Sequence, residues 1–214
     1  MGKEVMKVKL AEYPRLTIIM RGYSYEQAAA ILEAMTGLEK EYAVEMTLNT
    51  PGALEHIKLL NERFGNRIKI GAGTVRTFDQ AKAAYDAGAK FLLGPHMFSK
   101  EMLDFANEKE MVAVPAAMTP SEIDEMFKKG ADIVKVFPAT VVTPRFFKDV
   151  QAPLGKLPLM GVGGISEKNA KAFLDNEASY LGIGSGMFNK NDLATLNVEN
   201  LRESLQTFLD VLNS

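Results

Sequence analysis

The sequence contains no cysteine and only two histidines, His56 and His96. The absence of cysteine excludes disulfides and thiolate metal ligands, and two histidines provide too little material for a histidine-rich catalytic metal site. We therefore predict chemistry without a metal ion, with carboxylate-bound magnesium as the alternative.

Neither sign of charge dominates the chain. Its 25 basic residues face 27 acidic ones, a net charge of −2, so no summed positive field attracts nucleic acid or anionic lipid. No stretch approaches the roughly 18 consecutive apolar residues of a membrane span, and charges interrupt the opening segment MGKEVMKVKLAEYPR. These features predict a cytoplasmic protein.

Short β-branched runs alternate with longer segments of helical periodicity, a pattern typical of repeated βα units around a parallel sheet. Apolar residues make up 47% of the 214 positions, as expected for a globular chain of this size. The pattern predicts one domain over residues 1–214, a single (β/α)₈ barrel of the TIM type. The eight expected strands are Leu16–Met20, Tyr42–Thr47, Ile68–Ala72, Phe91–Gly94, Met111–Pro115, Ile133–Phe137, Leu157–Val162 and Tyr180–Gly184.

Hydroxyl side chains precede most of the helical segments, where they can cap a helix N-terminus, and two of them are followed by proline at the first helical position. We expect the helix after the sixth strand to begin near Pro144, residues 189–197 to form a linker, and a last helix to span Val198–Leu212. The expected caps are Ser24, Thr50, Thr77, Ser99, Thr119 and Ser166.

Lys135 lies within the apolar run IVKVF. Alternation along a strand places Ile133, Lys135 and Phe137 on one face, so Lys135 points into the barrel if the intervening valines pack on the helices. Burial lowers the pKa of a lysine, and a neutral amine can attack a carbonyl carbon to form an iminium ion, which withdraws electrons from a neighbouring carbon–carbon bond. The alternative is a lysine that reaches solvent or pairs with a carboxylate.

Glu45 is placed in the same way by the run YAVEMT, whose alternation groups it with Ala43 and Thr47. A carboxylate near an inward lysine can act as a general acid and base through water, or it can form a structural ion pair. The residues alone leave both interpretations open.

Glycine-rich turns follow three of the expected strands. Backbone N–H groups in the loops after strands seven and eight of a barrel commonly bind phosphate, although glycine can also simply mark a tight turn. A phosphorylated substrate is therefore consistent with the turns Gly71–Val75, Gly161–Ser166 and Gly182–Met187.

Seven sequence blocks in order resemble the family of 2-keto-3-deoxy-6-phosphogluconate (KDPG) and 4-hydroxy-2-oxoglutarate (KHG) aldolases. The similarity covers nearly the whole chain. The blocks are IIMRGYSYEQA, VEMTLNTPGAL, GAGTV, VPAAMTPSE, IVKVFPA, GVGGIS and LGIGSGMF.

The resemblance implies a role for each site residue. Lys135 takes the Schiff-base position and Glu45 the acid/base position. Arg21 matches a residue that helps to hold the anionic substrate, with a strand-end salt bridge as its alternative. Thr74 matches a hydroxyl near the pyruvate carboxylate, with turn capping as its alternative. Further matches are Pro95 and Phe137, which shape the pocket or simply pack, and the phosphate-binding positions Gly163, Gly164, Gly184 and Ser185.

Two positions depart from the gluconate-type pattern. Asn49 replaces a common arginine and Val162 replaces a threonine, and both substitutions are similar to relatives that cleave the galactonate epimer. A hydroxyl missing at Val162 removes a polar contact that can separate epimers. Val162 can also be a neutral packing choice.

The resemblance implies reversible cleavage of a 2-keto-3-deoxy-6-phosphohexonate to pyruvate and glyceraldehyde 3-phosphate without metal or organic cofactor. It also suggests 4-hydroxy-2-oxoglutarate as a second substrate and a homotrimer. Two rival functions are a phosphate-binding barrel isomerase or epimerase, which does not require the inward lysine, and a non-catalytic barrel that binds a phosphorylated metabolite. His96 is expected to face solvent beside Pro95.

Overall fold

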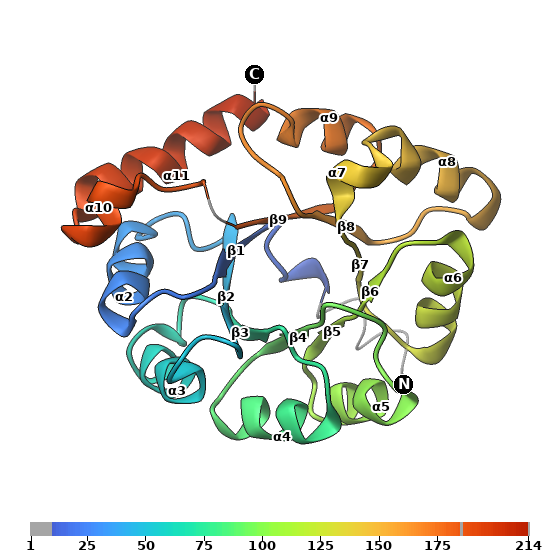
Figure 1. Cartoon of the computed structure of the whole chain (residues 1–214), viewed down its shortest axis with the longest axis horizontal. Coiled ribbons are helices and arrows are strands. Elements are labelled where there is room, and N and C mark those ends of the chain that lie inside the picture. Colours follow the sequence, from blue (N-terminus) through green and yellow to red (C-terminus); the bar gives the residue numbers. More distant parts are fainter. Residues whose placement is uncertain (1–9, 185, 214) are drawn as a thin grey trace.

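The computed structural model describes residues 10–184 and 186–213, which form a ring of parallel strands surrounded by helices (Figure 1). The strands neighbour one another in the order β5-β4-β3-β2-β1-β9-β8-β7-β6. Their bounds are β1 Leu16–Met20, β2 Tyr42–Thr47, β3 Ile70–Gly73, β4 Phe91–Leu93, β5 Val112–Val114, β6 Ala116–Ala117, β7 Val134–Val136, β8 Leu159–Val162 and β9 Tyr180–Ile183.

The predicted (β/α)₈ barrel is confirmed, with one difference in the fifth strand. The expected run Met111–Pro115 becomes two short strands, because Pro115 has no N–H to donate. Before Pro115 the chain pairs with β4, and after it Ala116 pairs with Lys135 of β7. The carbonyl of Pro115 still accepts from the Lys135 N–H at 2.9 Å, so the bent segment joins the two sides of the ring.

Helices connect successive strands and cover the outside of the ring. They are α2 Tyr25–Ala34, α3 Ala53–Phe64, α4 Phe78–Asp86, α5 Lys100–Glu108, α6 Pro120–Lys129, α7 Ala139–Val142, α8 Arg145–Leu154, α9 Ala170–Asp175, α10 Lys190–Ala194 and α11 Val198–Asn213. None of the helices within the described residues has the length and apolar character needed to cross a membrane.

Four of the six predicted caps are confirmed: the side chains of Ser24, Thr77, Ser99 and Thr119 accept N–H bonds from the first turns of α2, α4, α5 and α6. The predictions that Thr50 and Ser166 cap helices were wrong. The buried Thr50 hydroxyl accepts from the Gly22 N–H at 2.9 Å, and α3 begins only after Gly52. Asn169 precedes α9 in place of Ser166.

The segments around α8 and the last helix agree with expectation, with two additions. Helix α8 begins after Pro144 and α11 begins at Val198, as predicted. The connection after β7 also contains α7, and the expected linker contains α10.

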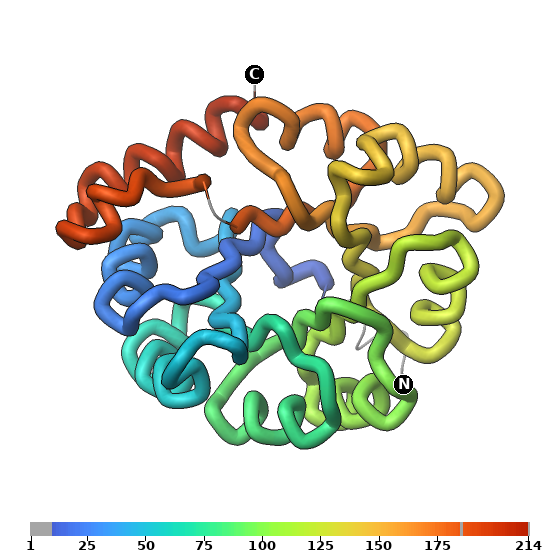
Figure 2. Tube along the Cα trace, viewed as in Figure 1, coloured from blue at the N-terminus to red at the C-terminus, as the bar shows by residue number. Residues whose placement is uncertain are grey.

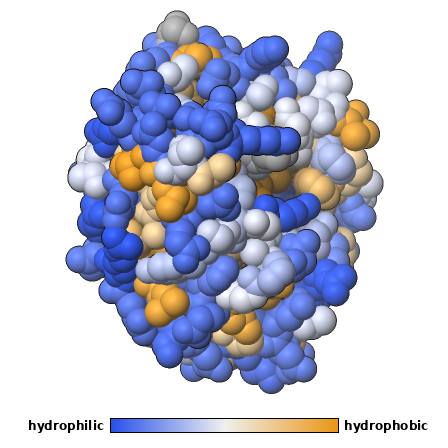
Figure 3. All heavy atoms as spheres, turned by 60° about the vertical axis from the view of Figure 1, so that its left-hand side comes forward, coloured by the Kyte–Doolittle hydropathy of each residue, from blue (hydrophilic) through white to orange (hydrophobic). Residues whose placement is uncertain are grey.

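Helix α11, near the end of the chain, lies beside α2, which follows the first strand. Figure 2 shows α11 packed along α2. The Tyr42 hydroxyl donates to the Leu205 carbonyl at 2.8 Å, and Arg202 donates to the Ala34 carbonyl at 3.1 Å. The face over these helices is mainly hydrophilic, with small and separated hydrophobic patches (Figure 3).

Two apolar layers show which way each strand residue points. Val134 and Val136 pack with the helices in the outer cluster, whereas Ile133 belongs to the cluster inside the ring. On β2, Val44 packs outward and Ala43 inward. The strand alternation read from the sequence is therefore confirmed for both strands, and Lys135 and Glu45 point into the barrel.

Candidate active site

A cavity of about 310 Å³ opens at the carboxyl ends of the strands. Lys135 of β7 and Glu45 of β2 both line it, although they are 90 positions apart in the chain. Barrel enzymes carry their catalytic groups at this end, where the βα loops begin. The cavity also contains Arg21, Thr74, Pro95, Phe137, Val162, Gly163, Gly164 and Gly184, all expected at the site from the sequence.

Lys135 is almost fully enclosed, with 5% of its surface exposed. Burial lowers the pKa of its amine, Glu45 acts in the opposite direction, and Arg21 lowers the pKa further. The amine lies 5.0 Å from the centroid of the Phe137 ring, which covers it at the mouth. This lysine therefore does not reach bulk solvent, and its surroundings favour the neutral, nucleophilic form.

Glu45 is 2% exposed, and its Oε2 has no hydrogen-bond partner in the described residues. Burial raises the pKa of the carboxyl, while Lys135 and Arg21 act to lower it. A carboxyl with a raised pKa can both give and take protons near neutral pH.

No ion pair within the described part of the chain joins Glu45 to Lys135, or Arg21 to any carboxylate. The three charged groups act on one another through the cavity without direct contact. The alternatives of a structural Lys135–Glu45 pair and of an Arg21 strand-end salt bridge are therefore not what the structure shows. The intervening space can hold a reacting molecule.

Thr74 follows directly after β3 with a φ of 56°, in the left-handed region that non-glycine residues rarely adopt. Thr77, not Thr74, caps α4 by accepting from the Gln80 N–H. Turn capping therefore does not explain Thr74. Its strained backbone holds the residue at the cavity wall, as is common at functional sites.

Gly73 leaves room for the Glu45 carboxylate. A methyl group on Gly73 would overlap this carboxylate, and even Oε2 would lie only 2.6 Å from the added carbon. The φ of Gly73 is not in the left-handed region, so space and not backbone freedom explains this glycine. Gly73 thus positions the acid/base candidate.

We predict that Gly73→Ala lowers the free energy of unfolding by about 1–3 kcal/mol, because the added methyl overpacks the buried carboxylate. In a Glu45→Ala background the same change should have a much smaller effect, because the conflicting group is gone. Urea unfolding of the four proteins in this cycle measures the coupling. Equal losses in both backgrounds would show that Gly73 does not act through Glu45.

Two residues from the sequence analysis are not placed in the cavity. Asn49 lies in the turn after β2 with its side chain exposed, and it does not line the cavity. Ser185 lies outside the described residues. His96 is exposed, as expected, and contacts the Met97 carbonyl through Nδ1 at 2.7 Å. His56, on α3, is half-buried, and its Nδ1 is enclosed.

Three further residues line the cavity that were not predicted from the sequence: Ile19, Tyr23 and Ile165. The position of Ile19 could have been predicted, because the alternation of side chains along β1 directs it into the barrel. Tyr23 and Ile165 lie in loops, where no periodic pattern indicates the direction of a side chain.

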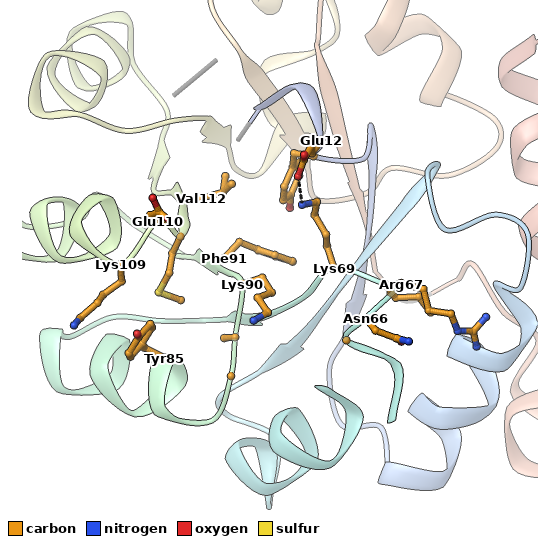
Figure 4. A pocket seen from close by; sticks show the side chains of 16 residues that line it. Glu12, Asn66, Arg67, Lys69, Tyr85, Lys90, Phe91, Lys109, Glu110 and Val112 are labelled. Carbon is orange, nitrogen blue, oxygen red and sulfur yellow. Dashed lines mark hydrogen bonds and ion pairs between the residues drawn. The ribbon is translucent and has the colours of Figure 1, made fainter. Parts of the chain in front are cut away.

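A larger cavity of about 920 Å³ lies at the opposite end, where β3, β4 and β5 begin (Figure 4). Its charged groups differ from those of the smaller cavity because they are largely exposed or already paired. Lys69 pairs with Glu12 at 3.3 Å, and Arg67 pairs with Glu39 at 2.9 Å. None of the described lysines that line it is buried, so the smaller cavity is the better candidate for covalent chemistry.

Comparison with known proteins gives consistent matches. The family model described as KDPG and KHG aldolase matches residues 9–203. A probable 2-dehydro-3-deoxy-6-phosphogalactonate aldolase of Rhizobium meliloti is 31% identical, with 81% of each chain covered. The 2-dehydro-3-deoxy-6-phosphogalactonate aldolase of Escherichia coli is 28% identical, covering 81% of this chain and 84% of the relative.

A solved structure adds a chemical comparison. The KDPG aldolase of Legionella pneumophila, with pyruvate captured as a covalent carbinolamine intermediate, superimposes with a TM-score of 0.80. It is 25% identical, and the match covers 94% of this chain and 95% of the other.

Proposed function

Since this chain belongs to the KDPG and KHG aldolase family and is a carbon–carbon lyase, we propose that Lys135 is its Schiff-base residue and Glu45 its general acid and base. The substrate is a 2-keto-3-deoxy-6-phosphohexonate, and the products are pyruvate and glyceraldehyde 3-phosphate. One observation carries this assignment. Within the described residues, the buried Lys135 amine forms no ion pair and faces the same cavity as Glu45, whose Oε2 has no hydrogen-bond partner.

Lys135 begins the proposed reaction by attacking the C2 carbonyl of the substrate. Loss of water gives a protonated imine, which is the electron sink, so the reaction requires neither metal nor organic cofactor. Glu45, acting through water, removes the proton of the C4 hydroxyl. The C3–C4 electron pair then moves toward the iminium nitrogen, releasing the aldehyde and leaving an enamine. Protonation of C3 and hydrolysis of the imine release pyruvate and restore Lys135.

The remaining cavity residues orient the substrate in this proposal. The Arg21 guanidinium lies free of ion pairs within the described residues and attracts the anionic substrate, while the Thr74 hydroxyl binds the pyruvate carboxylate. Pro95 and Phe137 shape the walls. The backbone at Gly163, Gly164 and Gly184, together with Ser185, binds the phosphate.

We assign the preference between the galactonate and gluconate epimers to Val162. Its side chain is buried in the cavity wall, where it offers no hydrogen bond to a substrate hydroxyl. A methyl group on Gly182 would lie 2.8 Å from Val162 Cγ2, so Gly182 leaves room for this side chain. Asn49 does not share this role, because it does not line the cavity.

We predict that the chain cleaves the galactonate epimer of the substrate at least as well as the gluconate epimer. The reason is that Val162 lacks the hydroxyl expected in gluconate-type relatives, and polar contacts of this kind decide between close analogues. Pyruvate release from each epimer, measured as kcat/KM, tests the proposal, with Val162→Thr expected to shift the ratio toward gluconate. A strong gluconate preference of the unaltered chain would contradict the assignment of Val162.

The same assay separates the proposed function from its rivals. A sugar-phosphate isomerase or epimerase rearranges its substrate without releasing pyruvate, and a non-catalytic metabolite-binding barrel leaves it unchanged. Cleavage of 4-hydroxy-2-oxoglutarate to pyruvate and glyoxylate, a homotrimeric assembly and a cytoplasmic location are further proposals from the sequence.

A further inference from the structure

Tyr23 lines the cavity from the loop between β1 and α2, one residue before the cap of α2. Its ring is half-buried and packs against the outer apolar cluster, which limits its freedom. Neither the periodicity nor the family resemblance assigned it a role. It is nevertheless one of the few polar side chains in the cavity, together with Arg21, Glu45, Thr74 and Lys135.

The Tyr23 hydroxyl differs from those of the two most deeply buried tyrosines. Tyr13 shares a hydrogen bond with the Thr17 hydroxyl at 3.0 Å, and Tyr42 donates to the Leu205 carbonyl. Among residues 10–184 and 186–213, the hydroxyl of Tyr23 has no such partner. The Tyr23 hydroxyl is not sealed inside the protein, and Tyr23 lines the cavity, so a molecule bound there can become its hydrogen-bond partner.

The strand order places Tyr23 on the phosphate side of the cavity. Strand β1 pairs with β9, with Ile18 opposite Ile183, so the loop after β1 runs beside the turn that begins at Gly184. The turn at Gly163 and Gly164 follows β8, the next strand around the ring. Thr74, assigned to the carboxylate end of the substrate, follows β3 on the other side of β2.

Burial also raises the pKa of the Tyr23 phenol, which keeps its proton in place. A neutral O–H can donate to a phosphate oxygen without adding another charge, while the nearby Arg21 supplies the positive charge. A substrate without a phosphate group cannot accept this hydrogen bond, so the donor favours phosphorylated substrates.

We propose that the Tyr23 hydroxyl donates a hydrogen bond to the phosphate of the substrate and thereby selects phosphorylated over non-phosphorylated keto acids. This inference rests on the proposed aldolase function and names a specificity residue of the same site.

The test compares Tyr23→Phe, which keeps the ring, with Tyr25→Phe. Tyr25 is a suitable control because it is also half-buried, lies on the first turn of α2 near His56, and does not line the cavity. For Tyr23→Phe, KM for the phosphohexonate should rise about tenfold or more, as expected for a lost hydrogen bond to a charged group, while kcat changes far less. The concentration of pyruvate needed for half-maximal borohydride trapping should not change, because pyruvate carries no phosphate. Tyr25→Phe should behave like the unaltered chain.

Titration with inorganic phosphate, followed by calorimetry, gives a readout that does not depend on catalysis. Tyr23→Phe should bind inorganic phosphate several-fold more weakly than the unaltered chain and Tyr25→Phe. Unchanged KM and unchanged phosphate affinity in Tyr23→Phe, or an equal loss with pyruvate, would overturn the proposal. If the unaltered chain releases no pyruvate from either epimer, the proposed function fails, and the phosphate titration still tests Tyr23.

Discussion

Borohydride reduction in the presence of pyruvate should attach one reduced pyruvyl group to the unaltered chain and none to Lys135→Met. The iminium between pyruvate and Lys135 is the species that borohydride traps, and methionine has no amine to form it. Turnover should fall on the order of 10⁴-fold or more, because the covalent pathway disappears entirely. Intact-protein and peptide mass spectrometry locate the adduct, and pyruvate release measures the turnover.

The pH dependence of trapping offers a second measure of Lys135. Attack requires the neutral amine, whose fraction rises with pH through the pKa of the folded protein. An ordinary lysine has a pKa of about 10.4, and burial lowers the pKa of Lys135 below this value. The initial trapping rate should therefore reach its plateau at a pH well below the pKa of an ordinary lysine. Lys90→Met, which removes an exposed lysine at the opposite end of the barrel, should leave trapping unchanged. An adduct that persists in Lys135→Met would place the Schiff base elsewhere.

Glu45→Gln should reduce kcat by roughly a hundredfold or more while leaving the fold intact, because glutamine keeps the shape of the side chain but cannot transfer a proton. Steady-state pyruvate release measures the effect, and circular dichroism with thermal unfolding checks the fold. Glu41→Gln provides the control: Glu41 directly precedes the same strand, is exposed, and lies outside the cavity. Its turnover should equal that of the unaltered chain.

The pH profile of the unaltered chain should carry the signature of Glu45. Burial raises the pKa of this carboxyl, so as pH falls the base is protonated, and activity is lost, at a higher pH than for an ordinary glutamate with a pKa of about 4.3. This acidic limb should be missing from the residual activity of Glu45→Gln. Near-normal turnover in Glu45→Gln, or an unchanged acidic limb, would remove Glu45 from the mechanism.

The strand positions were largely predictable, because two local patterns determine them. Short apolar, β-branched runs and the helical periodicity of the segments between them located β1 and β2 to the residue. The division of the fifth strand was not read from the pattern, although Pro115 was visible. Whether a proline interrupts a strand depends on which neighbour needs the missing N–H, and that neighbour is defined only in the assembled sheet.

The caps illustrate the same limit. Ser24 and Thr119 cap their helices because an N-terminal hydroxyl satisfies the nearest free N–H groups, which is a local effect. Thr50 has the same local sequence signal, but its hydroxyl bonds to Gly22 N–H, 28 positions away. A long-range partner displaced the local one.

The orientation of Lys135 and Glu45 followed from the alternation of side chains within single strands, which requires no knowledge of the rest of the chain. Their meeting in one cavity required closure of the ring, because only the closed barrel places β2 and β7 on opposite sides of a shared interior. The same closure brings the Tyr23 loop beside the turn after β9 and leaves Asn49 outside, and no local pattern could distinguish these two loop residues. Short-range sterics assign each residue to a face, whereas the charges that shift the pKa values of Lys135 and Glu45 come from distant strands and exist only once the chain has folded.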